Sequence, residues 1–316
     1  MAAIEKRKAG ERTLPANLIF VLIAGVFAMA SSSIFIRYAQ AEGVSSIVIG
    51  GARLVIASLL LTPFVLRRYW HHVTALSRTD LLWGVASGFC LAVHFAAWIT
   101  SLEYTSVLVS TVIVTASPIW VALLEFVFLR TRPNRLIIVG LIVAIVSGII
   151  IALASNSPSS TSTDNNGQLI GIVLAVIGSV AVASYFVLGR KLRAQLPVIP
   201  YIWLVYACGG IFMTAVILVS GLQVVGFSSN AYLWLICCAI FPQLIGHSSL
   251  NYAVGYLPAT FVSMITQLEP IGSAILAFII FAELPAPLQI IGSALLLFGV
   301  ILASLGQNQP APKADE

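Results

Sequence analysis

Two related stretches decide the fold of this chain: SLEYTSVLVSTVIVTASPIWVALL at residues 101–124, and GYLPATFVSMITQLEPIGSAILAFIIFAE at residues 255–283. Adding 152 to positions in and just beyond the first stretch brings identical residues into register with the second. The matched pairs are Tyr104 with Tyr256, Pro118 with Pro270, Pro133 with Pro285, and Gly140 with Gly292. Coincidence between apolar segments is the alternative, but landmarks of three residue types at one offset indicate an internal repeat.

The composition around these stretches is that of a membrane protein. Of the 316 residues, 59% are hydrophobic and 9% are charged, and the mean hydropathy is +1.03. Soluble domains have about 25% charged residues, so the composition excludes a water-soluble globular enzyme, and it equally excludes a disordered chain. The four cysteines lie in apolar runs without the spacing of a zinc site or a disulfide framework. They are expected to be small buried hydrophobic residues.

Ten apolar runs are long enough to cross a bilayer, which takes about 20 helical residues each. They cover residues 17–38, 45–66, 81–103, 106–128, 136–154, 168–189, 199–220, 231–253, 258–281 and 288–306. Because lipid satisfies no backbone hydrogen bonds, most of the backbone at that depth must be helical. The sequence therefore predicts an all-α integral membrane protein with ten transmembrane helices.

Most basic residues fall on one side of the membrane if these ten helices alternate in direction. They are Lys6, Arg7, Lys8, Arg12, Arg67, Arg68, Arg78, Arg130, Arg132, Arg135, Arg190, Lys191, Arg193 and Lys313. The polar loop predicted on the other side, residues 155–167, has neither lysine nor arginine. Since cytoplasmic loops are rich in these residues, we expect both termini in the cytoplasm and the protein in the plasma (inner) membrane. The net charge of +5 then reports orientation, and no nucleic-acid partner is expected.

The two halves are predicted to insert in opposite directions, because each contains five helices, an odd number. A weaker match at an offset of 153 pairs Gly25 with Gly178 and Arg37 with Arg190. Inverted repeats with a binding site at their interface recur among transporters. The expected organisation is a cytoplasmic tail at 1–16, a first repeat at 17–154, an external loop at 155–167, a second repeat at 168–306, and a cytoplasmic tail at 307–316.

Together with AEGVSSIVIGGARLVIA at residues 41–57, the two quoted stretches resemble EamA-type repeats of the drug/metabolite transporter superfamily. The resemblance spans nearly the whole chain. It implies a ten-helix carrier, often an exporter, with a central cavity between its halves. The solutes it implies are small organic metabolites, amino acid-like or drug-like. The sequence departs from the family at Arg130-Thr131, where a Gly-Glu pair is frequent.

Matched prolines point to the binding site. Pro118 and Pro270 fall near the midpoints of their spans, and a helix proline frees the carbonyl four residues earlier. Interrupted helices at corresponding places in two repeats are the best sequence indication of a transporter site. The polar residues beside them are candidate binding residues: Thr111, Thr115 and Gln267. The alternative is a plain proline kink with threonines bonded to their own helix.

Glu269 is the carboxylate expected near the middle of the membrane. A charge there costs about 3 kcal/mol or more, so intramembrane ionisable groups are functional by default. Its partner position in the repeat is Ser117, so the symmetry supplies no second acid. Glu269 suits a proton or the amino group of a solute. The alternative is a neutral acid hydrogen-bonded inside the bundle.

Two histidines and their neighbours complete the candidate binding site. Gln243, His247 and Asn251 recur every four residues and predict a polar stripe on the eighth helix. His94 lies one residue out of register with His247 in the repeat, and no ligand spacing beside them suggests a metal. The aromatic candidates are Trp98 and Tyr185. Structural histidines and packing aromatics are the alternatives.

Other polar residues are expected to serve structure. Arg53, with Arg37, is placed toward the external face and expected to pair with acids there. Glu125 is placed near the cytoplasmic end of the fourth helix, where it snorkels or pairs with a loop arginine. Spans 136–154 and 288–306 carry small residues, which let helices approach closely in lipid. These two spans are expected to pack against each other, or against a second subunit in a homodimer.

The function expected from these features is secondary transport, with export as its direction and proton linkage through Glu269. The chain has no Gly-rich phosphate loop for ATP use, and no cofactor, metal or catalytic residue is expected. The predicted partners are a small-molecule solute and the lipid bilayer. An intramembrane enzyme using His94, His247 and Glu269 is one alternative, although motifs of metalloproteases and serine hydrolases are missing. A non-transporting scaffold or sensor is another, although the loops are short.

Overall fold

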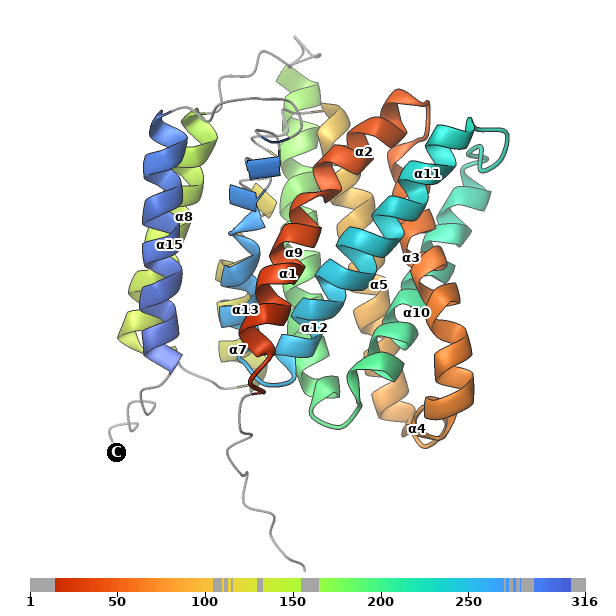
Figure 1. Ribbon diagram of the computed structural model, residues 1–316, viewed down its shortest axis with the longest axis horizontal. Coiled ribbons are helices and arrows are strands. Elements are labelled where there is room, and N and C mark those ends of the chain that lie inside the picture. The colour runs from red at the N-terminus through yellow and green to blue at the C-terminus, as the bar shows by residue number, and fades with distance from the viewer. Residues whose placement is uncertain are drawn as a thin grey trace, which may run out of the picture.

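The computed structural model describes a bundle of helices (Figure 1). The described residues are 15–104, 110, 113–114, 116–129, 133–154, 165–269, 271–272, 275–276, 279 and 287–307. In the first half the helices are α1 (Leu18–Ala30), α2 (Ser32–Ala41), α3 (Ser46–Phe64), π-helix η1 (Val65–Tyr69), α4 (Trp70–Thr74), α5 (Arg78–Tyr104), α7 (Ser117–Leu129) and α8 (Arg135–Ala154). In the second half they are α9 (Asn165–Arg193), α10 (Val198–Val219), α11 (Ser229–Cys238), π-helix η2 (Ala239–His247), α12 (Ser248–Val254), α13 (Ala259–Thr266) and α15 (Pro287–Gln307).

The apolar helices coincide with the predicted spans. Within the described residues, six segments are long and apolar enough to cross a membrane: Leu18–Ala41, Ser46–Thr74, Arg78–Tyr104, Leu169–Arg193, Val198–Val219 and Ser229–Val254. Three shorter apolar helices are Ser117–Phe128, Arg135–Ser147 and Ile290–Ala303. The predicted span 106–128 ends with α7 and the predicted span 258–281 begins with α13, and much of the remainder of both lies outside the described residues. The all-helical, multi-pass membrane fold is confirmed.

The two halves run in opposite directions. α1 begins and α15 ends at the lower end of the bundle in Figure 1, whereas α9, the first helix of the second half, begins at the upper end. The contacts obey the same symmetry: α1 packs on η2 and α12, as its counterpart α9 packs on α5. The pairs α3–α10, α7–α13 and α8–α15 each join corresponding helices of the two halves. The inverted five-helix repeat is therefore a property of the packing as well as of the sequence.

Glycine contacts reproduce this symmetry at atomic distance. A Cβ atom on Gly25 would stand 3.5 Å from the carbonyl oxygen of Gly246, and one on Gly178 would stand 3.5 Å from that of His94. Gly25 and Gly178 correspond at the offset of 153, and His94 and Gly246 correspond at the offset of 152. Both crossings let backbones approach through a small residue, as expected inside a membrane.

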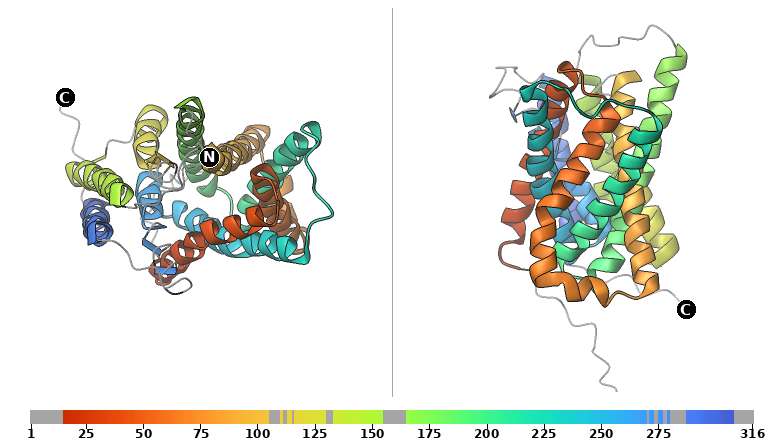
Figure 2. Two further views of the ribbon diagram at one scale, coloured as in Figure 1. Left: turned by 90° about the horizontal axis from the view of Figure 1, so that it is seen from above. Right: turned by 90° about the vertical axis from the view of Figure 1, so that its right-hand side faces the viewer.

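α8 and α15 form a pair at one edge of the molecule (Figures 1 and 2). A Cβ atom on Gly140 would lie 2.6 Å from the carbonyl oxygen of Gly299, so these backbones touch. At the end of the same interface, Nδ2 of Asn134 donates to the carbonyl of Gly306 over 2.6 Å. The predicted spans 136–154 and 288–306 therefore pack against each other, as α8 and α15. Gly140 and Gly299 each face the other helix of the same chain.

Candidate functional site

A cavity lies where the two halves meet. Its volume is about 490 Å³ including its open mouth. From the first half it is lined by Met29, Ser32, Arg53, His94, Trp98, Val114 and Ser117. From the second half it is lined by Val182, Phe186, Pro242, His247, Thr266 and Glu269. Both repeats thus contribute polar and apolar walls, as in a binding site for an amphipathic solute.

The backbone beside the cavity is interrupted at matched places. α7 begins only at Ser117, and α13 ends at Thr266. Each break contains two successive turns closed by hydrogen bonds three residues apart. In the first half, the N–H of Ala116 donates to the carbonyl of Ile113 at 3.3 Å, and the N–H of Ile119 donates to the carbonyl of Ala116 at 3.1 Å. In the second half, the N–H of Leu268 donates to the carbonyl of Ile265 at 3.0 Å, and the N–H of Ile271 donates to the carbonyl of Leu268 at 3.1 Å. Each residue that forms these hydrogen bonds in the first half corresponds, at the offset of 152, to one that forms them in the second half. Both spans therefore break in the same way.

Residues at these breaks face the cavity in corresponding pairs. Val114 and Thr266 form one pair, and Ser117 and Glu269 the other. The carbonyl of Val114, expected to be freed by Pro118, accepts a hydrogen bond from Oγ of Ser179 at 3.2 Å. The candidates Thr111 and Thr115 lie outside the described residues.

The two histidines come together across the repeat interface. The ring centroids of His94 and His247 are 6.5 Å apart, and Trp98 stacks on His94 at 5.8 Å. Nδ1 of His94 lies 3.0 Å from the carbonyl oxygen of Gly178, which only accepts, so Nδ1 carries the proton. Nδ1 of His247 has no hydrogen-bond partner in the described part of the chain. Within that part, no three His, Cys, Asp or Glu residues stand close enough to hold a metal ion.

Arg53, which is expected from the sequence to pair with an external acid, lines the cavity. Only 1% of its surface is exposed, and it makes no ion pair with an external acid among the described residues. Its Nε donates to Oε1 of Gln243 at 2.9 Å, and its Nη1 donates to Oγ of Ser32 at 3.3 Å. Its Cζ lies 4.1 Å from the ring centroid of Phe95. The signal available in the sequence was its depth, two helical turns inside α3.

The remaining candidates are buried but do not line the cavity. Gln243 holds Arg53, and Asn251 donates through Nδ2 to the hydroxyl of Tyr206 over 3.4 Å. The predicted stripe on the eighth helix is therefore split, because η2 is a π-helix whose turn is wider than the spacing of four assumes. The ring centroid of Tyr185 lies 6.4 Å from that of His247, and Tyr185 is not a lining residue of the cavity. Gln267 is 3% exposed.

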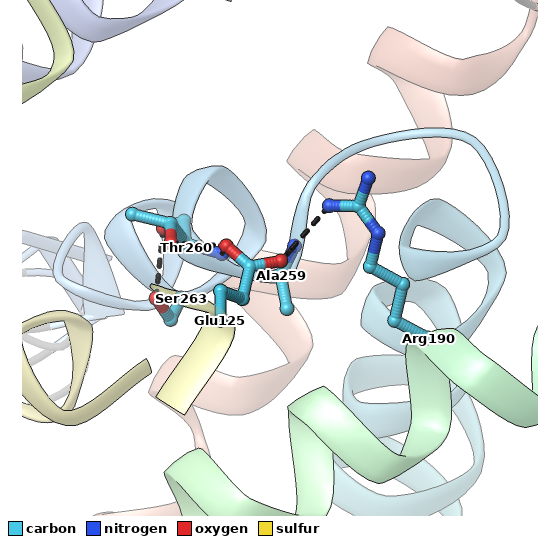
Figure 3. A network of polar contacts seen from close by, with 5 residues as sticks. All are labelled: Glu125, Arg190, Ala259, Thr260 and Ser263. Carbon is cyan, nitrogen blue, oxygen red and sulfur yellow. Dashed lines mark hydrogen bonds and ion pairs between the residues drawn. The ribbon is translucent and has the colours of Figure 1, made fainter. Parts of the chain in front are cut away.

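A second polar network joins the two halves away from the cavity (Figure 3). The carboxylate of Glu125 on α7 accepts hydrogen bonds from the N–H groups of Ala259 at 3.0 Å and Thr260 at 3.2 Å, at the start of α13. It also accepts from the Thr260 hydroxyl and pairs with Nη1 of Arg190 on α9 at 2.9 Å. The sequence predicts an arginine partner for Glu125. It does not predict that Glu125 caps α13, because no local sequence pattern indicates a contact between positions so far apart.

Comparisons with known proteins agree with this architecture. A family model described as the EamA-like transporter family matches residues 17–153 and 169–305. A solved crystal structure shares the fold with a TM-score of 0.73 over 93% of this chain and 99% of its own, at 13% sequence identity.

Relatives with curated names point the same way. An uncharacterized transporter of Archaeoglobus fulgidus is 28% identical over 76% of this chain and 78% of its own. The uncharacterized transporter YetK of Bacillus subtilis is 22% identical over 94% of this chain and 90% of its own. A protein of Streptantibioticus cattleyicolor, named probable terminal-alkyne amino-acid exporter, is 28% identical over 64% of this chain and 66% of its own.

Proposed function

Because this chain belongs to the EamA-like transporter family, we propose that it exports small organic solutes by secondary transport through the cavity between its two repeats. Residues 17–154 and 168–306 are the two halves that move against each other. The protein lies in the plasma (inner) membrane with both termini and the arginine-rich loops in the cytoplasm. α1 begins and α15 ends at the same end of the bundle, which supports a location of both termini on one side of the membrane (Figure 1).

The observation that carries this proposal is the paired lining of the cavity at two broken helices. Val114 with Thr266, and Ser117 with Glu269, contribute equivalent positions from opposite halves. A site shared in this way is exposed to one side or the other when the halves rock, which is the geometry that alternating access requires. The amino-acid exporter among the relatives supports amino acid-like solutes.

Glu269 is the residue proposed to bind the coupling proton or the amino group of the solute. It lines the cavity, and no described residue forms a hydrogen bond or ion pair with it. An acid inside a membrane bundle needs a counterpart, and a solute ammonium or a proton supplies one. His94, Trp98 and His247 form the adjoining wall.

Flux measurements test the proposal. Internal and external metabolites are first compared in cells with and without the gene. Flux of the exported solutes is then measured in proteoliposomes over about 3 pH units around neutrality. We expect Glu269→Gln to insert normally and to lose transport or its pH dependence. The matched control is Glu103→Gln, which changes an exposed acid. Wild-type flux and an unchanged pH profile in Glu269→Gln would remove Glu269 from the mechanism, and product formation without a second compartment would favour an enzyme.

A further inference from the structure

The buried charge of Arg53 lacks a negative partner of its own. A guanidinium inside the bundle is costly unless it is paired, and Arg53 is 1% exposed. Its hydrogen bonds go to neutral groups, Oε1 of Gln243 and Oγ of Ser32. Among the described residues, the ion pair of the bundle is Glu125 with Arg190, so no described carboxylate stands within 4.0 Å of Arg53.

These neutral contacts fix the direction of the guanidinium. Gln243 accepts the hydrogen bond from Nε, Ser32 accepts the one from Nη1, and the centroid of the Phe95 ring lies 4.1 Å from Cζ. Arginine is planar and its donors form a rigid fork, so three contacts determine where the rest of the fork points. Nη2 has no hydrogen-bond acceptor in the described part of the chain, and Arg53 lines the cavity.

Unpartnered polar atoms on other cavity residues point to a ligand as well. Nε1 of Trp98 is a buried donor without a partner among the described residues, and an indole N–H can only donate. Nδ1 of His247 is buried without such a partner, on a side chain that is 4% exposed. Buried polar atoms are rarely left without a partner, and the partner that the Trp98 N–H lacks is an acceptor.

We propose that Arg53 binds the carboxylate of the transported solute, and that Gln243 is the positioning residue that aims it. The inference rests on the proposed function. It assigns Arg53 as the residue that binds the carboxylate end of the solute, whose amino group is proposed to bind Glu269. Arg53 and Glu269 line one cavity without forming an ion pair. A solute that carries both charges satisfies both residues. A doubly charged phosphate does not, because Glu269 repels the second charge.

Three solute pools in proteoliposomes separate this proposal from general transport. The pools are the standard L-amino acids, their carboxamides, and their N-acetyl derivatives, and efflux of each component is followed by mass spectrometry. We expect wild-type protein to move zwitterions in preference to the other two pools. Arg53→Gln should lower zwitterion flux by at least about 10-fold, the loss of one charge-assisted hydrogen bond, and shift the preference toward carboxamides. Wild-type flux of carboxamides equal to that of amino acids overturns the proposal.

The role of Gln243 is tested by a variant of the same size that places a negative charge beside Arg53. Gln243→Glu places a carboxylate against Nε of Arg53, so it should raise KM for zwitterions by about 10-fold with little change in maximal flux or in carboxamide flux. Gln223→Glu, in an exposed loop, is the matched control. If Gln243 had a purely structural role, the variant would lose flux equally for all three pools. That result would contradict the proposal.

Failure of this proposal is distinguishable from failure of the proposed function. If no amino acid is moved, the carboxylate assignment is wrong, while the metabolite comparison in cells still reports whether the protein exports other solutes. If cells with and without the gene have identical metabolites and no pool is moved, both proposals are wrong.

Discussion

The carboxylate of Glu125 lies 2.9 Å from Nη1 of Arg190, and the same carboxylate caps the first turn of α13 (Figure 3). One side chain of the first repeat thus joins two helices of the second. Glu125 is 5% exposed, so its charge depends on these partners rather than on water. The contact lies near the C-terminal end of α9, where Arg190 is followed by Lys191 and Arg193.

Removing the charge of Glu125 should loosen this contact. We expect Glu125→Gln to lower the free energy of unfolding by about 1–2 kcal/mol, because the Arg190 side chain is 32% exposed and can be hydrated instead. Glu125→Ala should cost about 1 kcal/mol more, since it also removes the cap of α13. Thermal unfolding of the purified protein measures both. The exposed Glu103→Gln serves as control, and an unfolding midpoint unchanged in Glu125→Ala would show that the network contributes nothing to stability.

Two pseudo-equivalent glycines should respond differently to the same substitution. A Cβ atom on Gly25 would lie 2.5 Å from Cβ of Ser249, whereas one on Gly178 would lie 3.4 Å from Cβ of Trp98. Gly25→Ala must therefore push α1 from the eighth span, at a cost of about 1–3 kcal/mol. Gly178→Ala meets ordinary contact distances and gains helix propensity of up to about 1 kcal/mol. Thermal unfolding of the two variants decides, and equal shifts would contradict the packing described here.

The proposed orientation predicts opposite labelling of two exposed positions. In a background without the four native cysteines, a membrane-impermeant maleimide should react from outside with Val225→Cys and not with His71→Cys. Val225 is 71% exposed in the segment between α10 and α11, and His71 is exposed on α4, at the other end of the bundle. Reaction of residue 71 in intact cells, with residue 225 protected, would reverse the orientation.

His247 should matter for flux more than for folding. His247→Phe keeps a ring beside Phe95 and Tyr185, whose centroids lie 5.2 Å and 6.4 Å from the imidazole, but it removes both ring nitrogens from the cavity. We expect flux of the exported solute to fall about 10-fold, the loss of one polar contact, with membrane insertion unchanged. His71→Phe is the histidine control outside the cavity. Normal flux through His247→Phe would mean that His247 only packs.

Much of the fold is predictable from this sequence because lipid imposes simple rules. A span must be apolar and helical, so the run at 199–220 gives α10 within one residue at each end. The offset of 152 likewise anticipates that both proline-bearing spans break in the same way. These features follow from local composition and from a comparison of the chain with itself.

The cavity is less predictable because its polar contacts join distant positions. Arg53 and Gln243 are separated by 190 residues, and only packing shows that one holds the other. The sequence places Arg53 in the outer part of its span, but it does not show that the side chain lines a cavity. Of the stripe on the eighth helix, His247 lines the cavity, whereas Gln243 and Asn251 do not, because Pro242 lies within a π-helix, where a period of 3.6 does not apply.

Among the described residues, the network at Glu125 has no counterpart on the opposite face, and from this we expect a preferred resting state in the proposed transport cycle. Arg190 corresponds to Arg37, which is exposed and makes no ion pair among the described residues, and the position equivalent to Glu125 is occupied by Ala277. Two perfectly matched halves would make the inward-open and outward-open forms degenerate. We expect a one-sided contact worth about 1–2 kcal/mol to lift that degeneracy and to favour the form in which it is made by about 5–30-fold. Site-directed labelling of cavity residues should show this bias in wild-type protein and its loss in Glu125→Gln.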